Sequence, residues 1–171
     1  MGAEFYGYYV SYEDDKNNAL QKLRNREFEA GRYNPALSQW AYDGKCSYEE
    51  TFNLFSNIIE DTKGLLVLGK AHASIDEAIE ESGAEGTRSI LDLCEVSDNL
   101  NYSRAYVIKD DELVKYMGSE KPTQEEFEEG FWTYTDYIGN YIHTLRGTGF
   151  CATIYKDGLP NKLFFGGWSY D

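Results

Sequence analysis

Aromatic and β-branched residues open the chain and predict a first strand over residues 5–12. The apolar positions of residues 16–30 then fall on one helical face, with an aspartate cap before them and Gly31 as a stop signal after them. An Asn-Pro pair opens the next segment, and we expect residues 34–46 to form a loop.

Capping boxes, in which Ser or Thr precedes Glu by three residues, stand at Ser47, Ser74 and Thr123 and predict the starts of three helices. The helix after Ser74 turns its carboxylates to solvent. The last helix contains Gly130 and Gly139, at either of which it could break. The helix that starts after Ser47 has the apolar stripe Tyr48, Phe52, Phe55 and Ile59. The helix that starts after Thr123 has the apolar stripe Phe127, Phe131, Tyr134, Ile138 and Tyr141.

Short apolar runs between these helices predict strands, and a further helix is expected over residues 110–117. The expected strands span residues 64–68, 87–96, 105–108, 150–155 and 163–168. The last two form a hairpin around Asp157-Gly158. Because helices and strands intermix, we predict a single α+β domain over residues 1–171. Its mixed or antiparallel sheet is flanked by amphipathic helices and ends in the C-terminal β-hairpin.

The net charge of -14 lies in the middle of the chain. Residues 41–136 carry 22 acids and eight bases, whereas the excess of one acid before this segment cancels the excess of one base after it. Nucleic-acid binding and anionic membranes both require a basic patch. With 16 basic against 30 acidic residues, the sequence favours neither.

Fifteen Tyr, nine Phe and three Trp accompany this charge, so the chain has enough apolar surface to fold, unlike a disordered acidic tail. No run of about 18 apolar residues and no signal peptide is visible. Cys46, Cys94 and Cys151 show no disulfide or zinc spacing, and we expect reduced thiols, at least two of them buried. These features predict a cytoplasmic protein.

His72-Ala73-Ser74 resembles the HxS/HxT element of two-histidine phosphoesterases. This resemblance implies a second such element, but His143 is followed two positions later by Leu145. The alternative function is therefore a small-molecule or phosphoester-processing enzyme that uses His72 and His143 as acid and base.

Other candidate chemistry is sparse. Cys46 precedes a helix start that could lower its pKa, although an inert thiol is the more common case. Arg88 and Asp92 share one face of the strand expected there and could form an ion pair. Phosphate-loop, dinucleotide and EF-hand patterns are missing. The sequence predicts neither a cofactor nor a metal site.

Acidic helices in an aromatic-rich chain favour a non-enzymatic binding protein that docks on a basic surface of a protein partner. In composition, though in no motif, the chain resembles immunity proteins and phage inhibitors that mimic nucleic acid. Carboxylates would steer association, and exposed Trp or Tyr side chains, Tyr102 among them, would anchor it. Carboxylates that serve solubility alone are the plainer alternative. The expected partner-binding residues are Asp76, Glu77, Glu80, Glu81, Asp110, Asp111, Glu125, Glu126, Glu128, Glu129, Trp40, Tyr42 and Trp132.

Overall fold

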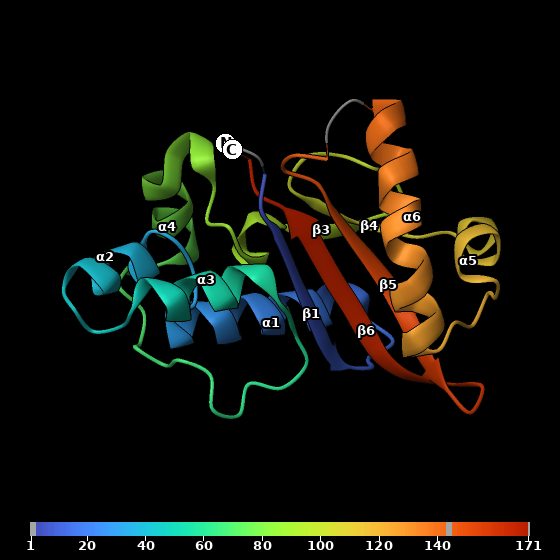
Figure 1. Cartoon of the computed structure of the whole chain (residues 1–171), viewed down its shortest axis with the longest axis horizontal. Helices are drawn as coiled ribbons and strands as arrows, with labels where there is room; N and C mark the ends of the chain where they lie inside the picture. The colour runs from blue at the N-terminus through green and yellow to red at the C-terminus, as the bar shows by residue number, and fades with distance from the viewer. Residues whose placement is uncertain (1–2, 143–144, 171) are drawn as a thin grey trace.

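A mixed six-stranded sheet with the strand order β2-β1-β6-β5-β4-β3 forms the centre of the protein (Figure 1). The computed structural model describes residues 3–142 and 145–170, and for residues 140–142 the backbone alone. The strands are β1 (Phe5–Ser11), β2 (Ile58–Ile59), β3 (Glu95–Ser97), β4 (Arg104–Val107), β5 (Gly149–Lys156) and β6 (Leu159–Trp168). Strand β6 pairs antiparallel with both β1 and β5, whereas β2, β3 and β4 join in parallel.

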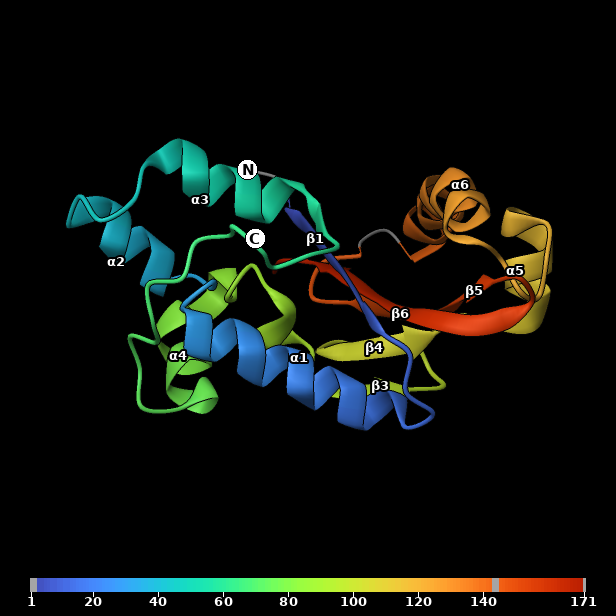
Figure 2. The ribbon, with the colours of Figure 1, turned by 90° about the horizontal axis from the view of Figure 1, so that it is seen from below.

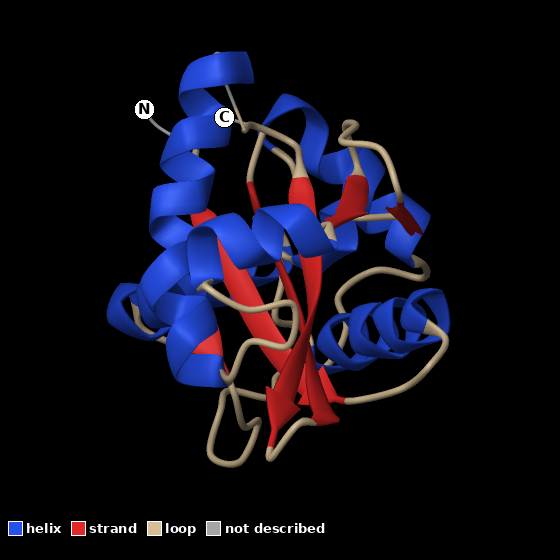
Figure 3. Cartoon of the chain, turned by 90° about the vertical axis from the view of Figure 1, so that its right-hand side faces the viewer, coloured by secondary structure: helices blue, strands red, loops and turns tan. Residues whose placement is uncertain are grey.

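The central strands are buried on both faces, because helices pack on two sides of the sheet (Figure 3). Strand residues alternate between the two cores, as the period of two requires. Tyr8 and Phe165 belong to one core, and their neighbours Tyr9 and Phe164 belong to the other. The aromatic residues of the chain thus fill two cores, one on each face of the sheet.

Each core is closed by its own helices. The first core takes apolar residues from α1 (Lys16–Ala30), α2 (Ala36–Tyr42), α3 (Tyr48–Ser56) and α4 (Ile75–Ser82). The second takes them from α5 (Asp110–Met117) and α6 (Gln124–Ile142). None of the helices in the described ranges is long and apolar enough to cross a membrane.

The predicted fold class is confirmed: the protein is a single α+β domain with a mixed sheet and a C-terminal hairpin. The first strand, the helix after it and the short helix before Gly118 also lie where the pattern places them. Asp15 accepts the cap hydrogen bond of α1 from the Asn18 amide, and Gly31 ends that helix in the left-handed conformation.

Three expected elements are wrong. The segment predicted as a loop contains α2, which forms because Ala36, Leu37 and Trp40 reach the core. Residues 64–68 form no strand, since their backbone bonds to the end of α1 and to a local turn. Of residues 87–96, only Glu95 and Val96 belong to a strand, β3, and the residues before them form a turn and the 3₁₀ helix Ile90–Asp92.

The expected Arg88–Asp92 ion pair is also wrong, because the two residues do not lie on one strand. Asp92 is buried and its Oδ1 accepts hydrogen bonds from the amide and the hydroxyl of Thr87, at 2.7 and 2.8 Å. Arg88 reaches Glu4 and Glu85 instead.

Gly130 does not break α6 but permits its contact with α5. A Cβ atom at this position would lie 2.3 Å from the Tyr116 carbonyl oxygen, so Gly130→Ala should destabilise the fold by about 1–3 kcal/mol. Gly139→Ala is the matched control, because its Cβ would meet only Leu145 at 3.7 Å. This control should stabilise the helix by about 0.8–1 kcal/mol. Urea unfolding measures the free energy of unfolding of both variants, and equal changes in the two would contradict the close approach of Gly130 to Tyr116.

Candidate functional site

Helix α3 presents its aromatic stripe to solvent. A reciprocal capping box starts the helix: the Glu50 amide donates to Ser47 Oγ at 3.1 Å, and the Ser47 amide donates to Glu50 Oε2 at 2.7 Å. The helix buries Thr51 and Leu54, whereas Tyr48 and Phe52 remain 74% and 64% exposed. Of the predicted stripe, Tyr48 and Phe52 therefore face outward, Phe55 packs against the core, and Ile59 lies beyond the helix, buried in β2.

An aromatic hollow lies on one side of this stripe, between α3, the start of β1 and α6. Its part nearest α6 encloses about 270 Å³ and is lined by Glu4, Phe5, Phe52, Phe55, Ser56, Ile58 and Trp132. The Phe5 and Trp132 rings meet edge to face, 4.9 Å between centroids, which positions the half-exposed Trp132. A second part of about 410 Å³ continues beneath α2, lined by Glu4, Asn34, Ser38, Ala41, Tyr48, Thr51, Phe52, Phe55 and Arg88.

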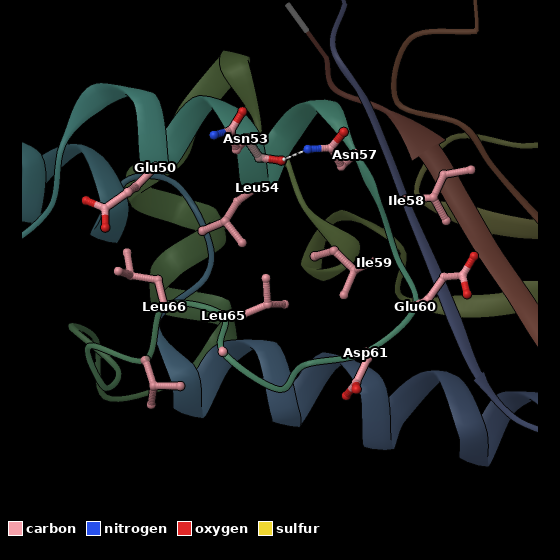
Figure 4. A pocket seen from close by; sticks show the side chains of 12 residues that line it. Glu50, Asn53, Leu54, Asn57, Ile58, Ile59, Glu60, Asp61, Leu65 and Leu66 are labelled. Atoms are coloured by element: carbon pink, nitrogen blue, oxygen red, sulfur yellow. Dashed lines mark hydrogen bonds between the residues drawn. The ribbon is translucent and has the colours of Figure 1, made fainter.

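A larger groove, which we call the acidic groove, lies on the other side of α3 and encloses about 560 Å³ (Figure 4). It is lined by Glu50, Asn53, Leu54, Asn57, Ile58, Ile59, Glu60, Asp61, Gly64, Leu65, Leu66 and Val67. The ionisable lining residues are Glu50, Glu60 and Asp61, so all of them are acidic. A hydrogen bond from the Ser47 amide lowers the pKa of Glu50 and favours its charged form.

The far wall of the acidic groove, residues 64–67, is tied to buried charges beneath it. Arg32 donates from Nη1 to the Leu66 carbonyl oxygen at 3.1 Å and also bonds the carboxylate of Glu27. Glu27 is fully buried at the end of α1 and accepts from Arg26 as well. The wall is thus held by an ion cluster in the protein interior.

A polar bridge joins the groove to α6. Gln124 donates to Glu60 and to Glu128, and Tyr9 donates its hydroxyl hydrogen to Glu128 at 2.9 Å. Burial and then Glu128 raise the pKa of Tyr9, so this hydroxyl remains a donor. Lys162 lies 3.9 Å from Glu60 and offsets part of its charge.

The residues predicted from sequence to bind a partner do not form one surface. Helices α4 and α5, which carry Asp76 and Asp110, lie at opposite ends of the long axis in both Figure 1 and Figure 2. Of the α6 carboxylates, Glu128 is connected to the acidic groove through Gln124, which donates to both Glu128 and Glu60. The exposed members are Asp76, Glu77, Glu80, Glu81, Asp110, Asp111, Glu125, Glu126, Glu129, Tyr42 and Trp132, whereas Glu128 is partly buried.

Trp40 corrects the prediction that it lies exposed in a loop. Its side chain is only 6% exposed, and its ring packs over Gly31 at the end of α1, where a Cβ atom would lie 2.1 Å from the indole. Trp40 therefore cannot anchor a partner in this fold. Tyr42 and Tyr102 are exposed, at 83% and 64%.

Two of the candidate catalytic residues, His72 and Cys46, occupy structural positions. His72 is nearly buried, with Nδ1 2.7 Å from the Tyr33 hydroxyl and Nε2 2.7 Å from Glu81, so both ring nitrogens are occupied. His143 lies outside the described residues. Burial raises the pKa of the Cys46 thiol, opposite to the expected effect of the helix start. Cys46 and Cys151 are buried and Cys94 is exposed.

Sequence reasoning missed both the acidic groove and the outward turn of the α3 stripe. One signal was available: the α3 sequence has apolar residues on two faces, and a helix beside the sheet buries only one of them. No group of three or more His, Cys, Asp or Glu within the described ranges could hold a metal ion. No protein-family model, no curated protein and no solved structure matches the chain.

Proposed function

We propose that the protein binds a basic protein partner on the surface around α3. The observation that carries this proposal is the pairing of an exposed aromatic stripe with an adjacent groove whose ionisable lining residues are all acidic. Large exposed apolar patches on soluble domains commonly mark interaction sites. The partner would seat an apolar side chain in the aromatic hollow and place Lys or Arg side chains over the groove.

The charge of the chain supports this choice of partner. At -14, the protein repels other acidic surfaces, including a second copy of itself, and attracts basic ones over a distance set by salt. Carboxylates around the groove would raise the association rate, and the aromatic residues would slow dissociation. Trp and Tyr are also the side chains most often found to dominate binding energy.

The enzymatic alternative has weaker support. A histidine that acts as acid or base must reach its substrate, but His72 spans Tyr33 and Glu81 with both nitrogens. That arrangement suits a hydrogen-bonded tie between α4 and the segment before it. The binding proposal therefore expects His72→Ala to change stability and leave partner binding in place.

Neutralising the groove tests the proposed function. The variant Glu50→Gln, Glu60→Gln, Asp61→Asn should bind its partner about tenfold or more weakly, because each exposed charge pair contributes roughly 0.2–1 kcal/mol. The matched control Asp76→Asn, Glu77→Gln, Glu80→Gln removes the same charge from α4. Both variants and the native chain would serve as bait in lysate of the source cells, at low and high salt.

A basic protein retained by the native chain and by the α4 variant, lost on the groove variant and released by salt, is the expected result. Retention on the groove variant together with loss on the α4 variant would move the binding surface to α4. Salt-independent retention on all three baits would contradict the electrostatic basis of the proposal.

A further inference from the structure

We propose that the acidic groove takes its partner as an extended, lysine- or arginine-rich segment that adds a strand to the free edge of β2. This inference rests on the proposed function and specifies how the partner binds. Three features carry it: an unpaired sheet edge, a facing wall with free backbone groups, and the charge of the lining.

Strand β2 is the edge of the sheet and pairs on one side with β1, through Ile58 with Gly7 and Ile59 with Tyr8. Beyond β2, the backbone of Glu60 and Asp61 makes no hydrogen bond to other described residues. Such an edge offers amide and carbonyl groups to an incoming strand. Residues 58–61 line the groove, so this edge opens into it (Figure 4).

The opposite wall is also available. The sequence pattern predicted a strand at residues 64–68, and the structure leaves this segment outside the sheet, across the groove from β2. Within the described chain, the amides of Leu66 and Val67 donate to no acceptor, and Val67 is 68% exposed. A strand entering the groove would therefore lie between two stretches of free backbone.

The lining determines which segment fits. Leu54, Ile59 and Leu65 supply an apolar floor, and the carboxylates stand around its margin, Glu50 on α3 and Glu60 and Asp61 after β2. An extended chain alternates its side chains between two directions. A segment that alternates basic and apolar residues can place the apolar set on the floor and the basic set near Glu50, Glu60 and Asp61. An acidic segment would be repelled.

The test uses a seven-residue peptide that alternates lysine and valine, added to the full-length protein labelled with ¹⁵N. We expect saturable, salt-sensitive binding that shifts the amide signals of Ile59, Glu60 and Asp61. Hydrogen exchange should slow at Glu60, whose amide faces the free edge of β2. The control peptide, which alternates glutamate and valine, should leave these signals unchanged.

Two further peptides carry N-methyl groups either on every valine or on every lysine. Successive amides of a strand point to opposite edges, so one set faces β2 and the other faces away. The peptide methylated on the amides that face β2 should lose affinity by at least about tenfold, because hydrogen bonding to an edge is directional. The other peptide turns its methyl groups toward residues 64–67 and should lose less affinity. If neither peptide loses more than about threefold, strand addition is overturned.

The outcomes separate this inference from the proposed function. If the lysine peptide shifts the amide signals of Phe52 and Trp132 but not those of residues 59–61, strand addition is overturned and docking around α3 remains supported. A lysine peptide that binds nowhere on this surface in a salt-sensitive manner would count against both.

Discussion

Glu27→Gln should lower the free energy of unfolding by about 3–5 kcal/mol, the loss typical when one partner of a buried ion pair is removed. Glu27 is fully buried, and its oxygens accept hydrogen bonds from Arg26 and Arg32. Glutamine preserves the shape but leaves the Arg32 guanidinium, which is itself buried, without a counter-charge. Urea unfolding at neutral pH measures the loss.

Glu29→Gln is the matched control on the same helix. Its carboxylate is 61% exposed and pairs with Lys70 at 2.9 Å, so its removal should cost about 1 kcal/mol or less. A loss below about 1 kcal/mol for Glu27→Gln as well would show that solvent or neighbouring groups compensate Arg32, against the burial in the structure.

Glu27→Gln should also change the wall of the acidic groove. Arg32 connects Glu27 to the Leu66 carbonyl, and Leu66 belongs to the wall of the acidic groove. Once Arg32 loses its partner, this wall loses the contact that holds it. Under conditions where Glu27→Gln is still folded, the Leu66 amide signal should shift and binding at the groove should weaken, whereas Glu29→Gln leaves both as they are.

Elements with a strong local pattern could be predicted from the sequence, and short elements that depend on tertiary packing could not. Helix α1 is predicted by its apolar stripe, its aspartate cap and the stop signal at Gly31. Helix α2 has only seven residues, follows an Asn-Pro pair and is held by Trp40 on Gly31, a contact between segments that no local pattern encodes. Strand β2 has two residues and depends wholly on pairing with β1.

The candidate site was harder to predict for the same reason. The sequence identifies an acidic, aromatic-rich chain, and Trp132 stands beside the aromatic hollow as a predicted anchor. Which face of α3 turns outward depends on its packing at the β1 edge. The acidic groove brings α3, β2 and residues 64–67 together, and its carboxylates are few and scattered in the sequence. The dense acidic clusters instead lie on α4 at one end of the molecule and on the packed pair α5 and α6 at the other.

Asp92→Asn should gain stability relative to the native chain as the pH rises, by about 2 kcal/mol between pH 4 and pH 7. Burial raises the pKa of Asp92 to about 6 from an ordinary 3.8, against the hydrogen bonds from Thr87. The difference between these values corresponds to about 3 kcal/mol. Asparagine resembles the neutral carboxyl and keeps an oxygen for Thr87.

The native chain loses stability as the pH rises because its folded and unfolded states bind the proton of Asp92 with different strength. Below about pH 4 the carboxyl is largely protonated in the folded chain, and its contribution to stability is greatest. As the pH rises toward 6, the unfolded chain ionises first while the folded chain retains its proton, so stability falls and then stays low. Urea unfolding of both proteins from pH 4 to pH 8 gives the difference directly, and Asp136→Asn, on the exposed face of α6, controls for the loss of one surface charge.

A difference that stays flat with pH, or one that favours the native chain at pH 7, would contradict a buried carboxylate at Asp92. The expected result also bears on the surface around α3. Asp92 holds the turn that begins at Thr87, and that turn carries Arg88 into the lining of the aromatic hollow. The hydrogen bonds from Thr87 favour the charged carboxylate, so Asp92→Asn should stabilise the fold by removing a buried charge and not by tightening this turn.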